Sequence, residues 1–201
     1  MVPFFQGKID NFCAVYAVLN AMKLICNISS LQARNLFADL LLRHSRNEAN
    51  FRAILYHTTD YNDLVDDFFL QLLKQFPVKV TAPFPDEAAA PSEDDIWNIL
   101  KDYAKPDEGR SAVFRFCRFA PLAAHPVADH WTTAQRVEGE TLHFFDCSLE
   151  KMGLYALPRH LLRVQAHIRP LEYVQVPPRS IRLVERCSEH EARKRMNSWL
   201  Y

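Results

Sequence analysis

The chain has 201 residues, of which 49% are hydrophobic and 12% aromatic, enough for one folded domain with a sizeable core. Lysine plus arginine and aspartate plus glutamate number 24 each, so the formal net charge is zero. A protein that binds nucleic acid through its phosphates usually has a basic excess, so we expect no nucleic-acid partner. No apolar run is long enough to cross a bilayer, and we expect no membrane association.

The five cysteines stand at 13, 26, 117, 147 and 187, an odd number with wide spacing. No CxxC pair or Cys/His spacing typical of zinc sites occurs among them, so we expect no metal and no organic cofactor. The first residues, MVPFFQGKID, do not resemble a signal peptide. We therefore expect reduced thiols and a cytoplasmic protein, with leaderless export as an effector left open.

The first part of the chain predicts mainly helices. A helix over about 12–26 follows Asp10 or Asn11 as its cap, and a second, over 31–44, follows Ser29 or Ser30. A third covers 61–76 and ends before a proline. A short strand is expected over 78–84, and Ser92 caps a helix over 93–104.

From about residue 110 the composition favours strands. The stretches 111–119, 130–137, 141–147 and 181–186 are rich in β-branched and aromatic residues and are separated by turn signals. A terminal helix is expected over 188–201. The order predicts an α+β domain over 1–201, with a mainly helical half over 1–109 and an antiparallel sheet half over 110–201.

Cys13 opens the first predicted helix, in the segment FCAVYAVLNAM. An apolar-flanked cysteine is most often a small core residue. A helix N-terminus and a neighbouring imidazolium are the two features that convert a thiol into a nucleophilic thiolate, and Cys13 has the first of them. Its function therefore depends on whether the fold brings a histidine to it.

His130 and Asp146 are the expected partners. His130 begins one predicted strand, Asp146 ends the next, and Glu138-Gly139-Glu140 joins them as a hairpin. With a three-residue loop, Asp146 lies opposite Thr132 and on the same face as His130. A two-residue loop would shift the register by one and place the two on opposite faces.

Other residues near these positions are given structural roles. His125 lies in a proline-bounded loop, and His143 alternates to the opposite face from Asp146. Cys147 follows Asp146 on the strand and should point to the other face, as a packed thiol. Asp129 is interpreted as a turn residue.

The chemistry of acyl transfer assigns roles to the four candidate site residues. Cys13 attacks a carbonyl, His130 takes the thiol proton and returns it to the leaving group, and Asp146 orients the imidazole. The backbone N–H of Cys13 and the side-chain amide of Gln6 are the expected oxyanion donors.

Gln6, Cys13, His130 with Trp131, and Asp146, in that order, resemble the papain-like cysteine peptidase superfamily. The resemblance implies a papain-like fold in which the cysteine-bearing helix packs on an antiparallel sheet that carries the other site residues. FCAVYAVLNAM is similar to segments of the Josephin deubiquitinases, the phytochelatin-synthase group and the bacteriocin-leader-processing peptidases. Ubiquitin-like-specific proteases also have an HW pair, but their histidine precedes their cysteine.

The favoured hypothesis is a cysteine peptidase or hydrolase that cleaves a peptide or isopeptide bond through a Cys-His-Asp triad and a thioacyl intermediate. Its partner would be a protein or peptide substrate, such as a ubiquitin-like protein or a leader peptide. An acyltransferase of the transglutaminase, transpeptidase or deamidase type would use the same triad. An inactive papain-like protein-binding module is the third alternative.

Overall fold

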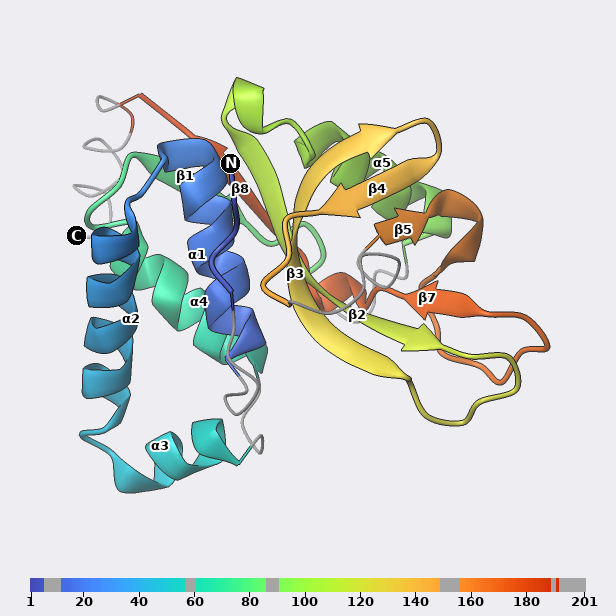
Figure 1. Cartoon of the computed structure of the whole chain (residues 1–201), viewed down its shortest axis with the longest axis horizontal. Helices are drawn as coiled ribbons and strands as arrows, with labels where there is room; N and C mark the ends of the chain where they lie inside the picture. Colours follow the sequence, from blue (N-terminus) through green and yellow to red (C-terminus); the bar gives the residue numbers. More distant parts are fainter. Residues whose placement is uncertain (6–11, 57–60, 86–90, 149–155, 189–190, 192–201) are drawn as a thin grey trace.

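The computed structural model describes residues 1–5, 12–56, 61–85, 91–148, 156–188 and 191. Within these residues the chain is a mixed α+β protein with five helices and an eight-stranded sheet (Figure 1). None of the described helices combines the length and apolar character needed to cross a membrane.

The helices agree closely with expectation where a local capping signal exists. Ser29 and Ser92 each form a capping box. The serine side chain accepts a hydrogen bond from the backbone N–H of the third helical residue, and the side chain of that residue accepts one from the serine N–H. The helix that begins at Cys13 has Phe12 as its cap residue, without a side-chain bond. Asp10 and Asn11, the expected caps, lie outside the described residues. The helices are α1 Cys13–Cys26, α2 Ser30–His44, α3 Glu48–Leu55, α4 Tyr61–Leu72 and α5 Glu93–Tyr103.

The strands form one curved sheet in the order β1-β8-β2-β3-β4-β5, with β7 also paired to β2 and β6 to β7. All pairs are antiparallel except β6 with β7. Short 3₁₀ helices cover Pro106–Glu108, Arg159–Leu161 and Pro178–Ser180. The strands are β1 Val78–Thr81, β2 Arg110–Phe119, β3 Ala128–Glu138, β4 Thr141–Phe144, β5 Ala156–Pro158, β6 Leu162–Arg163, β7 Tyr173–Gln175 and β8 Arg182–Arg186.

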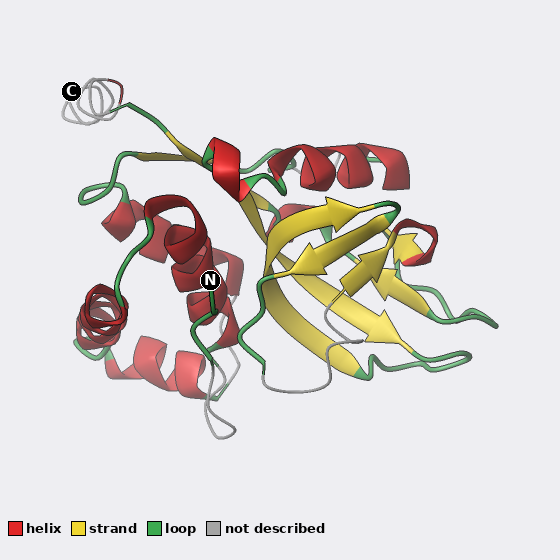
Figure 2. Ribbon diagram, turned by 45° about the horizontal axis from the view of Figure 1, so that its top comes forward, coloured by secondary structure: helices red, strands yellow, loops and turns green. Residues whose placement is uncertain are grey.

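Helices lie on both faces of the central strands (Figure 2). Helices α1, α2 and α4 form one core with Val113, Trp131 and Val184 of the sheet. Helix α5 forms a second core with Ala112 and Phe114, among others. Because neighbouring residues of a strand point to opposite faces, β2 contributes alternately to the two cores.

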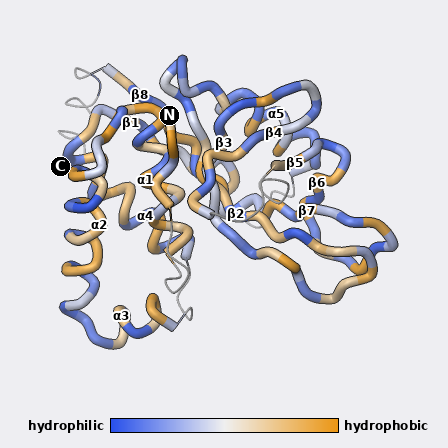
Figure 3. Tube along the Cα trace, in the orientation of Figure 1, coloured by the Kyte–Doolittle hydropathy of each residue, from blue (hydrophilic) through white to orange (hydrophobic). Residues whose placement is uncertain are grey.

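Helix α1 is the most deeply packed helix, and nine of its fourteen residues are buried. Figure 3 shows hydrophobic residues along much of α1 and α4. Two polar contacts connect this helical layer to the sheet. Thr133 Oγ1 donates to the Ala17 carbonyl at 2.6 Å. The guanidinium of Arg182 on β8 binds both carboxylate oxygens of Asp66 on α4, with the Nη2–Oδ2 distance at 2.7 Å.

The structure also differs from the expected elements. Helix α3 and strands β5, β6 and β7 were not predicted, whereas the strand expected over 78–84 is present as the shorter edge strand β1. The third helix ends at Leu72 rather than at residue 76, since turns follow it. Of the terminal helix expected over 188–201, only residues 188 and 191 are described, and of these only residue 191 is helical.

Candidate active site

Cys13 is the first residue of α1, and its side chain packs against the core that α1 forms with the sheet. The backbone N–H groups at a helix start have no partner inside the helix and carry partial positive charge. Helix α1 contacts β3, the strand that bears His130, and the Thr133–Ala17 hydrogen bond fixes the two together. The sequence therefore places a half-buried thiol at the positive end of a rigid helix.

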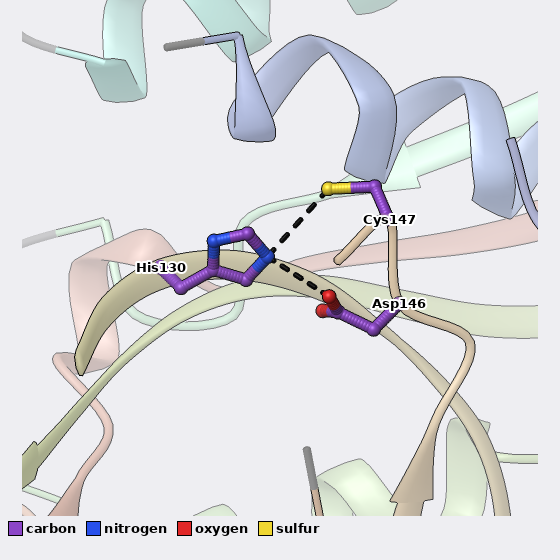
Figure 4. A group of neighbouring side chains, drawn as sticks. All are labelled: His130, Asp146 and Cys147. Atoms are coloured by element: carbon purple, nitrogen blue, oxygen red, sulfur yellow. Dashed lines mark hydrogen bonds and ion pairs between the residues drawn. The ribbon is translucent and has the colours of Figure 1, made fainter. Parts of the chain in front are cut away.

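His130 lies near the start of β3, opposite Phe116 of β2. The two rings meet edge to face with centroids 5.9 Å apart. His130 Nε2 is 3.0 Å from Asp146 Oδ1, and the side chains are 14% and 6% exposed (Figure 4). The structure thus brings His130 and Asp146 together in a largely buried pair, as their spacing predicted.

The hairpin reaches this geometry by a route that differs from the predicted one. Glu138 pairs with Thr141, so the loop has two residues, Gly139 and Glu140, rather than three. A β-bulge between Ala134 and Arg136 then shifts the register by one residue, and Ala134 pairs with Phe144. The bulge offsets the shorter loop. Asp146 and His130 therefore meet, although the predicted turn was wrong.

The His130 ring also shares a hydrogen bond with the thiol of Cys13. Burial by itself lowers the pKa of this imidazole, but hydrogen bonds with Asp146, Cys13 and Cys147 outweigh burial and raise the pKa above its ordinary value. The site therefore favours imidazolium at neutral pH. Cys13, His130 and Asp146 form one group, whereas Gln6 lies outside the described residues.

Cys147 was predicted to point away from the site, and that prediction is wrong. Its Sγ lies 3.6 Å from His130 Nε2 (Figure 4). Strand β4 ends at Phe144, so the alternation of side chains does not continue to residue 147. Burial raises the pKa of the Cys147 thiol to about 11, although the hydrogen bond with His130 opposes this. Cys147 is thus a neutral thiol inside the site.

Asp146 is held in place from a second direction, because the Ser148 backbone N–H donates to its Oδ1 at 2.7 Å. Its other oxygen, Oδ2, is buried and has no hydrogen-bond partner among the described residues. An unpartnered carboxylate oxygen away from water is costly. The ligand atoms of His130, Asp146 and Cys147 all lie within 4.8 Å of one another, close enough to share a metal ion.

The charge of Cys13 acts on two further side chains, Arg115 and Tyr61. Arg115 on β2 forms a bidentate pair with Asp129, with N–O distances of 2.6 and 2.5 Å, and Asp129 belongs to β3 rather than to a turn. Burial raises the pKa of Tyr61, at the start of α4, to about 12, and the charge of Cys13 adds to this shift. Sequence reasoning missed Arg115, although a cation within the apolar stretch SAVFRFCRF was the available signal.

The other histidines near the predicted site take no part in it. His143 Nε2 lies 3.2 Å from Glu138 Oε2 on the hairpin. His125 is exposed in the loop between β2 and β3. His130 is therefore the histidine that the fold places beside Cys13.

No family model matches this chain, and no curated protein matches it significantly.

Proposed function

We propose that this chain is a papain-like cysteine hydrolase that cleaves a peptide or isopeptide bond. The observation that carries the proposal is the contact between Cys13, at the first position of a buried helix, and His130, which Asp146 binds in turn. A nucleophile, a base and an orienting carboxylate in hydrogen-bond contact form the arrangement that acyl-transfer enzymes need.

The roles of the two ring nitrogens follow from the contacts. Asp146 and Cys147 both approach Nε2 of His130, and Nδ1 faces away from them (Figure 4). Nδ1 is therefore the nitrogen that we assign to proton exchange with Cys13. Asp146 accepts from Nε2–H, which stabilises the imidazolium and fixes the orientation of the ring.

In the proposed reaction, the Cys13 thiolate attacks the carbonyl carbon and the His130 imidazolium gives its Nδ1 proton to the departing amine. The resulting thioester is attacked by water, whose proton passes to His130, and release of the acid restores the thiolate. The negative oxygen of each tetrahedral intermediate would be stabilised by the Cys13 N–H at the helix start. The Gln6 amide stays the predicted second donor.

Covalent trapping tests this proposal without a known substrate. An epoxysuccinyl peptide alkylates a thiolate that sits beside a substrate groove, and the labelled residue is found by peptide mass spectrometry. We expect labelling of Cys13 that is lost in His130→Ala and retained in His143→Ala. Labelling of Cys13 no faster than that of the buried Cys117 would contradict the proposal and favour a binding module.

A labelled Cys13 still leaves the acceptor to be identified. A peptide library treated with the protein in the presence of glycine amide separates the two kinds of product by mass. We expect product peptides that end in a free carboxyl group. Products that carry the amine instead would show that the thioester is resolved by aminolysis, and the chain would be an acyltransferase.

A further inference from the structure

Three different donor atoms meet at the buried side of the His130 ring: an imidazole nitrogen, a carboxylate oxygen and a sulfur. His130 Nε2 lies 3.0 Å from Asp146 Oδ1 and 3.6 Å from Cys147 Sγ, as Figure 4 shows. Zinc bonds of about 2.0–2.3 Å at tetrahedral angles separate a nitrogen from a sulfur ligand by about 3.5 Å and from an oxygen ligand by about 3.3 Å. The two separations from Nε2 are therefore close to those around one zinc ion, and all three donor atoms lie within 4.8 Å of one another.

A second observation points to a cation independently of these distances. The side chain of Asp146 is only 6% exposed, and its Oδ2 has no hydrogen-bond partner in the described part of the chain. A buried, unpartnered carboxylate oxygen costs free energy unless a donor or a cation reaches it. A metal ion that binds both carboxylate oxygens of Asp146, beside His130 and Cys147, would satisfy it.

The donor set selects among metals. Thiolate and imidazole ligands favour zinc over the hard cations calcium and magnesium, which take oxygen ligands. Three protein ligands also leave one tetrahedral position open for water. We propose that His130, Asp146 and Cys147 form a zinc-binding site that switches off the catalytic histidine.

The inhibitory part rests on the proposed function, whereas the binding part does not. As zinc binds, the Nε2–H and S–H protons leave to solvent, and Zn–N and Zn–S bonds form. The metal-bound imidazole keeps its proton on Nδ1 and has no lone pair with which to accept another from Cys13. Zinc is therefore an inhibitor of the proposed hydrolase and not a cofactor.

Cobalt titration of the chelator-treated full-length protein tests the site without an activity assay. Co²⁺ replaces zinc, and a bound thiolate gives a charge-transfer absorption in the near ultraviolet. We expect one equivalent to bind, displaceable by Zn²⁺, with this absorption in the wild type, in Cys13→Ser and in Cys117→Ser. In Cys147→Ser the absorption should vanish and the affinity should fall at least about 100-fold, since even an outer-shell change costs 10–100-fold.

Several results would overturn the proposal. No cobalt absorption in the wild type would do so, and so would an absorption lost in Cys13→Ser but kept in Cys147→Ser. Circular dichroism establishes that each variant is folded. If Cys147→Ser does not fold, zinc X-ray absorption of the wild type decides, because a shell without sulfur excludes Cys147.

The two proposals fail in different ways. If the chain is not a hydrolase, no peptide is cleaved and Cys13 is not trapped, but the cobalt absorption still depends on Cys147. If there is no zinc site, the absorption is missing while epoxysuccinyl labelling of Cys13 proceeds and is unaffected by added zinc.

Discussion

His130 Nε2 and Asp146 Oδ1 lie 3.0 Å apart although a hairpin turn separates the two residues along the chain. The pair is largely buried, so its interaction is little screened by solvent, and it contributes to keeping the imidazole charged. The reactivity of Cys13 therefore depends on a carboxylate that it does not itself need to contact.

The first prediction concerns the order in which the cysteines react with iodoacetamide. Cys13 should be alkylated fastest at pH 6–7, because it shares a hydrogen bond with an imidazolium at a helix start. Burial raises the pKa to about 11 for Cys26 and Cys147 and to about 12 for Cys117, so these should react slowly, and faster only as the pH rises. Mass spectrometry of each peptide measures the rates.

Asp146→Asn should lower the pKa of His130, since a hydrogen bond to a charged acceptor becomes one to a neutral acceptor. The pH above which the hydrolysis rate falls, because His130 loses its proton, should then be lower than in the wild type. Such hydrogen bonds contribute about 1.5–3 kcal/mol, so hydrolysis should fall roughly 10–100-fold. NMR titration of the ring measures the pKa, with the exposed Glu138→Gln, beside His143, as the control. An unchanged His130 titration would contradict the assigned contact.

Two neighbouring threonines on β3 provide a matched pair of stability variants. Thr133 Oγ1 donates to the Ala17 carbonyl, so Thr133→Val should lower the free energy of unfolding by about 1 kcal/mol. Thr132 is equally buried, but its Oγ1 has no partner among the described residues, so Thr132→Val should be neutral or stabilising. Urea unfolding compares the two, and equal losses would argue against the Thr133–Ala17 bond.

The Arg115–Asp129 pair predicts a pH dependence of stability. Burial by itself raises the pKa of Asp129, but the bidentate bond from Arg115 outweighs it and leaves this pKa below the ordinary value. Such a group adds stability above its unfolded pKa, about 3.9, and loses it as the pH falls through the folded pKa. Because the pair is half exposed, Asp129→Asn should cost at most about 1 kcal/mol at pH 7 and little at pH 2–3.

Urea unfolding of this variant at both pH values measures the difference. Asp107→Asn, in an exposed position, is the control. A cost for Asp129→Asn that is the same at pH 7 and pH 2.5 would mean that the loss has a cause other than the charge.

Two glycines with positive φ should respond differently to alanine. Gly139, at φ 57° in the β3–β4 turn, has open space around its Cα, so Gly139→Ala should cost only the backbone strain, about 1–2 kcal/mol. Gly109, at φ 75°, would also place a Cβ 3.1 Å from the Arg186 Cβ, and its replacement should cost more. Thermal unfolding ranks the two, and Gly139→Asn should recover part of the loss.

The parts of the structure that could be predicted from sequence are those with local signals. Ser29 and Ser92 each carry the complete capping pattern, and α2 and α5 begin where expected. Helix α3 has only eight residues, EANFRAIL, and a single buried one, Ile54, so its apolar stripe is too short to predict a helix. Strands β5, β6 and β7 have two or three residues each, and their pairing partners, distant in sequence, define them.

The residues that form the candidate site were predictable, but the turn and the bulge that set the strand register were not. Cys13, His130 and Asp146 meet as expected. The two-residue loop and the bulge after Ala134 depend on tertiary packing, and no local sequence pattern indicates them. Cys147 was misplaced because the end of β4 at Phe144 is likewise not encoded in the alternation of TLHFFDC. The contact of Cys147 with His130 required the structure.

The pairing of β1 with β8 has a consequence for how the protein is made. Strand β8 ends at Arg186, about a hundred residues after the start of its partner β1 at Val78. Helix α1 packs against β2, β3 and β8, and α4 is bound to β8 through Asp66 and Arg182. During synthesis the helical segment leaves the ribosome well before the strands it covers. Its apolar surfaces stay exposed until β8 has emerged, so the interval before the sheet closes is when this protein most needs a chaperone.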